Sequence, residues 1–111
     1  MWTLEDAIEV CTLIESIAPK YGFHVALTGG LLYKEGPRKD CDIVLYRIRQ
    51  RHNPDWQGLW EALFMAGIVK LHDYGWCKKA KWMGLNLDIF DPEASGKYPI
   101  DLDLPIQEMP F

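Results

Sequence analysis

The chain has 111 residues; nearly half of them (49%) are hydrophobic, five are tryptophan, and the formal net charge at pH 7 is −4. This length predicts a single domain (1–111) with a core that needs no disulfides, and the modest negative charge argues against extensive electrostatic binding of nucleic acid. The three cysteines are widely spaced, and neither a secretory signal nor an apolar run of ~20 residues is present, so we expect a soluble, cytoplasmic protein that does not span a membrane.

The first predicted element is a helix that begins after Thr3. Thr3 and Asp6 are spaced as in a capping box, with Asp in the place of the usual Glu. Pro19 and Gly22 end the helix. Its apolar residues follow helical spacing: Leu4, Ala7, Ile8, Cys11, Ile14, Ile17 and Ala18. We interpret this helix as a packing element without chemistry of its own.

Residues 24–46 are the most informative stretch of the chain. An apolar run over 24–27 ends in Thr-Gly-Gly, and a second apolar run follows the sequence Asp40-Cys-Asp42. This alternation predicts two strands separated by a turn, with a short helix over 30–33. Side chains alternate along a strand, so Asp40 and Asp42 should share one face. Two carboxylates on one face repel unless a cation lies between them, and Mg²⁺ accepts such ligands while keeping positions for water and phosphate.

A phosphate-binding turn is predicted at Gly29 and Gly30, next to this strand. Glycines at a strand end adopt positive φ and allow close backbone approach, and main-chain N–H groups there bind phosphate oxygens. The following polar loop carries Arg38 and Lys39 immediately before Asp40. These cations are candidates for contact with a triphosphate, Arg38 first; the alternative is that they are solvated loop charges.

The second half of the chain predicts one helix and three strands. Asp55 is the candidate N-cap of a helix that ends at Gly67. The apolar stripe of this helix, which includes Trp56 and Trp60, is interpreted as core in preference to a base-stacking surface. Strands are predicted over 68–74, 76–83 and 85–90. The middle one places Lys78, Lys79 and Lys81 among apolar residues, as in a sheet with one solvated face; the alternative is that these basic residues bind nucleotide or acceptor.

A third carboxylate is predicted at Asp88, which lies between Leu87 and Ile89 in the last strand. A charge inside an apolar strand is costly unless it is paired or bound to a metal. Asp91 is the competing candidate, although Asp91-Pro92 is typical of a turn that ends a strand. Residues 92–111 hold four of the seven prolines and are predicted to form an irregular tail.

A Gly-Gly turn, about ten residues, Asp-x-Asp on a strand and a later strand carboxylate together resemble the nucleotidyltransferase superfamily, the group related to DNA polymerase beta. Gly29-Gly30 and Asp40-Cys41-Asp42 match the first two parts, spacing included. Families with Gly-Ser often carry an arginine soon after the turn, where this chain has Leu-Leu-Tyr. The resemblance implies an α/β (α+β) fold with a mixed sheet and helices mainly on one face, the minimal nucleotidyltransferase fold.

The resemblance also implies an activity, namely transfer of an NMP from an NTP to an acceptor hydroxyl with release of pyrophosphate. Asp40 and Asp42 would hold two Mg²⁺ ions, with Mn²⁺ as an alternative, and Asp88 would join the metal nearest the acceptor and act as general base. The acceptor stays open between a small molecule, a protein hydroxyl and an RNA end. A homodimer or a partner chain would complete the site.

Two further hypotheses belong to other functional classes. A catalytically inactive binding or regulatory module, antitoxin-like or partner-binding, is favoured by the short length and the missing arginine. A purely structural α/β domain would leave the aspartates facing water. Convergence of Asp40, Asp42 and Asp88 would favour the enzyme, because three carboxylates that repel one another would be retained at one point only where catalysis requires them.

Overall fold

The computed structural model describes residues 1–49 and 54–93, so the predicted tail lies outside the described residues from position 94 onward. The chain folds as α+β, with a five-stranded mixed sheet and helices packed against it, which confirms the predicted fold class. The elements in chain order are α1 (Leu4–Ile17), a 3₁₀ turn (Ala18–Tyr21), β1 (Phe23–Thr28), α2 (Gly30–Tyr33), β2 (Asp40–Arg47), α3 (Trp56–Met65), β3 (Ile68–Asp73), β4 (Cys77–Trp82) and β5 (Leu85–Phe90).

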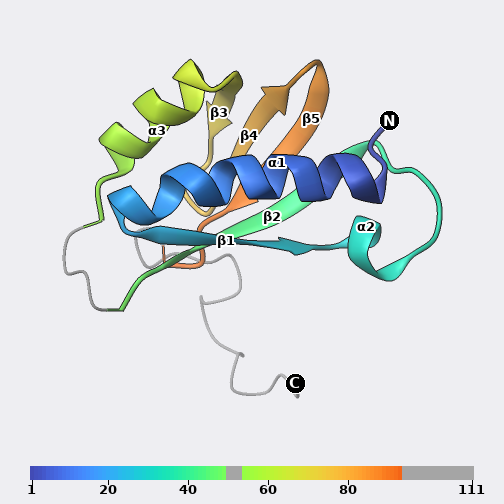
Figure 1. The fold of residues 1–111 in the computed structure, drawn as a ribbon, viewed down its shortest axis with the longest axis horizontal. Coiled ribbons are helices and arrows are strands. Elements are labelled where there is room, and N and C mark those ends of the chain that lie inside the picture. Colours follow the sequence, from blue (N-terminus) through green and yellow to red (C-terminus); the bar gives the residue numbers. More distant parts are fainter. Residues whose placement is uncertain (50–53, 94–111) are drawn as a thin grey trace.

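The strand order is β1-β2-β5-β4-β3. β2 and β5 run parallel, whereas the other neighbouring pairs are antiparallel. This parallel pairing brings together two strands that are far apart in the sequence, because α3, β3 and β4 lie between them in the chain. Figure 1 shows α1 and α3 on the same side of the sheet. We call that side the covered face and the opposite side the far face.

Alternation along β2 and β5 separates apolar from acidic side chains. Five residues of these two strands are fully buried in the core of the covered face: Cys41, Ile43, Leu45, Leu87 and Ile89. Asp42 and Asp88 have the opposite parity and therefore point to the far face. The period-two pattern of each strand thus places the acids on the side away from α1 and α3.

The predicted helix caps are present. The Thr3 hydroxyl accepts from Asp6 N at 3.1 Å, and the Asp6 carboxylate accepts from Thr3 N at 3.2 Å, which completes the capping box. Asp55 accepts from Gly58 N at 2.9 Å and caps α3. Within residues 1–49 and 54–93, no helix has the length and apolar character required to cross a bilayer.

Trp2 connects the N-terminus to the polar loop before β2. Its ring is fully buried and stacks on Trp82 with 5.7 Å between centroids, and its indole N–H donates to Asn86 O at 2.5 Å. Its backbone forms a β-bridge with Arg38, in which Trp2 N donates to Arg38 O at 2.8 Å and Arg38 N donates to Trp2 O at 3.1 Å. The position of Arg38 is therefore set by a core residue at the start of the chain.

Candidate functional site

The centre of the candidate site is a pair of carboxyl groups on adjacent strands. Asp42 on β2 lies directly opposite Asp88 on β5, and the two carboxyl groups are within reach of a shared hydrogen bond when one is protonated. Asp88 is buried, with 9% of its surface exposed, and Asp42 is half-buried. Burial raises the pKa of the Asp42 carboxyl, and the charges of Asp88 and Asp40 raise it further. The pair therefore attracts a cation.

Asp40 is on the same strand face, but it lies at the edge of this pair. It is the first residue of β2, it is exposed, and it is two positions before Asp42, which corresponds to ~6.6 Å along a strand. Over the part of the chain that the structure describes, no three His, Cys, Asp or Glu side chains are grouped closely enough to hold one metal ion together. Two of the predicted carboxylates are thus in contact, with the third beside them.

Lys79 belongs to the site through its contact with Asp88, which the sequence did not predict. It is the cross-strand partner of Asp88 on β4, and its ammonium lies 3.0 Å from Asp88 Oδ1. The hydrogen bond to Asp88 raises the pKa of the Lys79 ammonium. Alternation within 77–82 could have indicated the face of Lys79. That pattern does not show which residue lies opposite Lys79, because the opposite residue depends on the register of β4 on β5.

The three lysines of β4 do not share one wet face. Lys78 is buried, with 6% exposed, and points to the covered face, whereas Lys79 and Lys81 are exposed with the opposite parity. The prediction of a single basic face was therefore wrong for Lys78. Its aliphatic chain and cation are accommodated by aromatic and acidic neighbours, described below, which local sequence does not specify.

The Gly29-Gly30 turn packs directly on Asp42 and Arg38. Gly29 has φ +77° and ψ −158°, and a Cβ added there would lie 3.0 Å from Asp42 Cβ and even closer to its carboxylate. A Cβ added at Gly30 would lie 3.1 Å from Arg38 Nε. The predicted turn, its arginine and Asp42 are thus brought together, because both glycines lack the atom that would separate them.

Arg38 lies across Gly30 with a donor available. Its Nε is buried and has no hydrogen-bond partner among residues 1–49 and 54–93. Buried polar donors are normally paired, so this N–H is well suited to an anionic ligand at the turn. Lys39, the neighbouring candidate, is exposed.

Asp91, the competing third carboxylate, has a different role. Only 1% of it is exposed; it lies 3.4 Å from Arg47 Nη2 and accepts from Glu93 N at 3.2 Å. These contacts anchor the turn after β5, as its Asp-Pro sequence indicated. The carboxyl that lies directly opposite Asp42 is that of Asp88.

A small aromatic cavity of about 310 Å³ adjoins the carboxylate pair, and Asp88 and Lys79 form part of its lining. Trp76 and Phe90 stack there with 5.8 Å between ring centroids and 23° between planes. Phe90 is two residues after Asp88 on the same strand, so both side chains point to the far face. The sequence missed this cavity because Trp76 lies in a turn and meets Phe90 only in the folded sheet.

The donor set suits magnesium. Asp42 and Asp88 supply hard carboxylate oxygens, and Mg²⁺ is commonly held by one or two carboxylates together with water and substrate phosphates. Asp40, two residues before Asp42 on the same strand face, can extend that set. The repulsion that raises the pKa of Asp42 would be relieved by a bound cation.

No known protein family matches the chain, and no curated protein matches it in sequence.

Proposed function

We propose that the protein is a magnesium-dependent nucleotidyltransferase that moves an NMP from an NTP to an acceptor hydroxyl and releases pyrophosphate. The observation that carries this proposal is the Asp42–Asp88 pair with the glycine turn packed on Asp42. Carboxylates that can bind metal, next to a turn that can bind phosphate, are the groups that phosphoryl or nucleotidyl transfer requires.

The acids have distinct roles in this reaction. Asp42, Asp88 and Asp40 would hold Mg²⁺, with two ions proposed and Mn²⁺ as a substitute. When bound, the metal would neutralise charge on the triphosphate and on the attacking and leaving oxygens. The acceptor oxygen forms a bond to the α-phosphorus while the bond from that phosphorus to the pyrophosphate oxygen breaks. Asp88 takes the hydroxyl proton as general base, and pyrophosphate leaves with its electron pair.

The glycine turn and the basic loop bind the triphosphate. Main-chain N–H groups at Gly29 and Gly30 donate to phosphate oxygens. Arg38 supplies its unpartnered Nε donor, and Lys39 contributes charge from the exposed side of the loop. A phosphate oxygen of the substrate would thereby accept a hydrogen bond from the buried Arg38 Nε.

The nucleobase would stack in the aromatic cavity beside Asp88. Trp76 and Phe90 present a stacked aromatic surface there, and stacking on aromatic rings tolerates different bases. The acceptor belongs to one of three classes: a small molecule, a protein hydroxyl or an RNA end. A second copy of the chain or a partner chain would supply the acceptor side. Three unpaired cysteines suit a cytoplasmic location.

The decisive experiment is calorimetric titration of the four NTPs with Mg²⁺ against the wild type, Asp42→Asn and Asp88→Asn. We expect saturable binding that both variants lose. Glu9→Gln is a matched control, because it removes one carboxylate from the exposed side of α1, away from the site. Failure of every NTP to bind the folded wild type, or equal binding in all four proteins, would contradict the proposal. A pyrophosphate-release assay with candidate acceptors then separates turnover from binding.

A second candidate function is favoured by the Lys79–Asp88 ion pair. An ammonium 3.0 Å from Asp88 Oδ1 partly neutralises the carboxylates without a metal, as a nucleotide-binding regulatory module would require. Lys79→Met distinguishes the two functions. If the protein is a magnesium enzyme, removal of the competing cation should strengthen Mg²⁺ binding several-fold. If Lys79 replaces the metal, nucleotide binding should be independent of Mg²⁺ in the wild type and be lost in the variant.

A further inference from the structure

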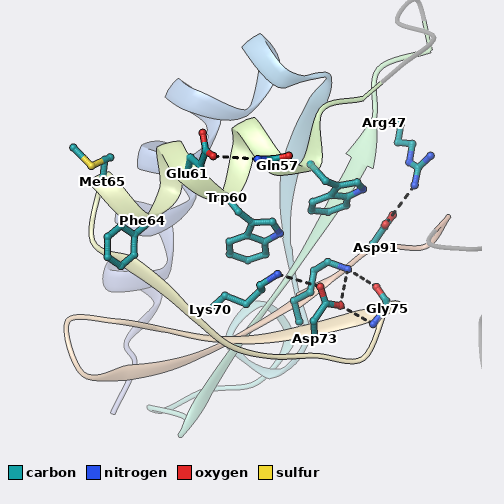
Figure 2. Close-up of a pocket in the computed structure, with 12 residues that line it drawn as sticks. Arg47, Gln57, Trp60, Glu61, Phe64, Met65, Lys70, Asp73, Gly75 and Asp91 are labelled. Atoms are coloured by element: carbon teal, nitrogen blue, oxygen red, sulfur yellow. Dashed lines mark hydrogen bonds and ion pairs between the residues drawn. The ribbon is translucent and has the colours of Figure 1, made fainter.

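A second and larger cavity lies on the covered face, between α3 and the edge of the sheet. Its volume is about 1010 Å³, at the upper end of the range for small-molecule sites. Figure 2 shows Trp60 extending from α3 toward the sheet, with Lys70 and Asp73 beneath it and Arg47 and Asp91 to one side. This cavity shares no lining residue with the aromatic cavity beside Asp88.

The wall of the cavity is aromatic. Trp56 and Trp60, one helical turn apart on α3, lie with 6.4 Å between ring centroids and 18° between planes. Both are only partly buried, so the expectation that these tryptophans are core holds in part. Phe64 continues the surface to the rim, where 62% of it is exposed. The wall is thus aromatic, and the ammonium groups of Lys70 and Lys78 lie near the Trp60 and Trp56 rings, 5.1 Å and 4.7 Å from their centroids.

The floor of the cavity carries excess positive charge. Lys78 is buried under Trp56, with its ammonium 4.7 Å from the ring centroid and 3.3 Å from Asp73. Lys70 lies 3.2 Å from the same carboxylate, and Arg47 lies 3.4 Å from Asp91. Three cations therefore share two carboxylates. Glu61, the other acid of the lining, is exposed on α3, where Gln57 donates to it.

Two donors in the lining have no acceptor. Arg47 Nε and Trp60 Nε1 are buried atoms without a hydrogen-bond partner among the described residues. Buried donors in folded proteins are nearly always paired, so two in one cavity indicate a ligand that supplies acceptors. An acceptor that is anionic also balances the excess charge of the floor.

We propose that this cavity binds a small aromatic molecule carrying a carboxylate or an equivalent anionic oxygen group. Its ring packs against Trp56 and Trp60, and its oxygens accept hydrogen bonds from Trp60 Nε1 and Arg47 Nε. Asp42 and Asp88 point to the far face, so this binding needs neither magnesium nor nucleotide. The site is independent of the proposed transferase reaction.

The test is titration of the ¹⁵N-labelled full chain with 2-naphthoate, with 2-naphthylmethylammonium as a matched probe of opposite charge. Trp60→Phe assigns the Trp60 indole N–H signal among the five tryptophans. We expect saturable, EDTA-insensitive movement of the Trp60 signal with naphthoate and none with the ammonium. The Trp76 indole signal, from the other cavity, should not move.

Two variants test the donors separately. Trp60→Phe keeps a ring but removes the N–H, and Arg47→Lys keeps the charge but removes Nε. Each should weaken naphthoate binding ~tenfold, as expected for loss of one charge-assisted hydrogen bond. Lys81→Met, which removes a cation from the far face, should leave binding unchanged.

Three outcomes would overturn the proposal. One is absence of saturable binding of 2-naphthoate at ~5 mM, where a ligand with Kd of about 1 mM is mostly bound. Another is equal response to the ammonium probe. The third is unchanged affinity for 2-naphthoate in Trp60→Phe. If Arg47→Lys does not fold, the result for Trp60→Phe alone decides.

Discussion

Gly29→Ala tests whether the glycine turn and the carboxylate pair form one structural unit. Gly29 has φ +77° and ψ −158°, a region essentially restricted to glycine, which costs another residue about 1–3 kcal/mol. The new methyl would also lie 3.0 Å from Asp42 Cβ, inside the ~3.5–4.0 Å of normal carbon contact. Such overpacking costs ~1–3 kcal/mol, and lower entropy of the unfolded chain returns ~0.4–1 kcal/mol. The expected net destabilisation is ~3 kcal/mol, the centre of a range of about 1–5 kcal/mol.

Gly36→Ala is the matched control. Gly36 also has positive φ (+91°), but no described atom lies within 4 Å of the Cβ that would be added. It should therefore show only the backbone cost, about 1 kcal/mol after the entropy offset. The difference between the two variants isolates the contact with Asp42.

Urea unfolding followed by tryptophan fluorescence measures both changes. With a slope of about 1–3 kcal/mol/M, a loss of ~3 kcal/mol lowers the midpoint by ~1–3 M. At urea concentrations that leave both variants folded, Gly29→Ala should lose Mg²⁺-dependent nucleotide binding and Gly36→Ala should retain this binding. Equal destabilisation by the two substitutions would refute the reasoning, because it would show that Gly29 does not press on Asp42.

Three further outcomes are expected. Burial and neighbouring acids raise the pKa of Asp42, so its contribution to stability is present below the unfolded pKa of about 3.9 and is lost as pH rises through the folded pKa. Stability against urea should therefore fall above about pH 4 in the wild type and fall less in Asp42→Asn. An unchanged pH profile in the variant would argue against the pair. Trp2→Ala should destabilise by ~3–5 kcal/mol in urea, because the ring is fully buried and stacks on Trp82; a loss below ~1 kcal/mol would show that this contact does not hold the loop. Burial raises the pKa of the Cys11 thiol to about 11 and that of Cys41 to about 12, so iodoacetamide at pH 8 should modify both slowly in the folded protein and rapidly in urea, as peptide mass spectrometry can follow.

Local patterns were sufficient for the elements of this fold. The capping box and helical spacing of α1, the Asp55 cap of α3 and the period-two alternation of β2 and β5 depend on residues a few positions apart. The sequence also marked Asp88 as unusual, because a carboxylate within the apolar strand β5 is costly to bury without a partner wherever the strand lies. The sequence by itself therefore determined that Asp40 and Asp42 share one strand face and that Asp88 lies within an apolar strand.

Register and packing decided the rest. Asp42 and Asp88 meet because β2 and β5 align in parallel across an intervening helix and two strands, and no short-range pattern encodes that alignment. The antiparallel register of β4 on β5 makes Lys79 the partner of Asp88 and places Lys78 opposite Ile89, on the covered face. The cavity under α3 depends on the distance at which a helix with two tryptophans packs on the sheet. Long-range contacts are set by the packing free energy of the whole core, so only the tertiary structure determines which side chains face one another.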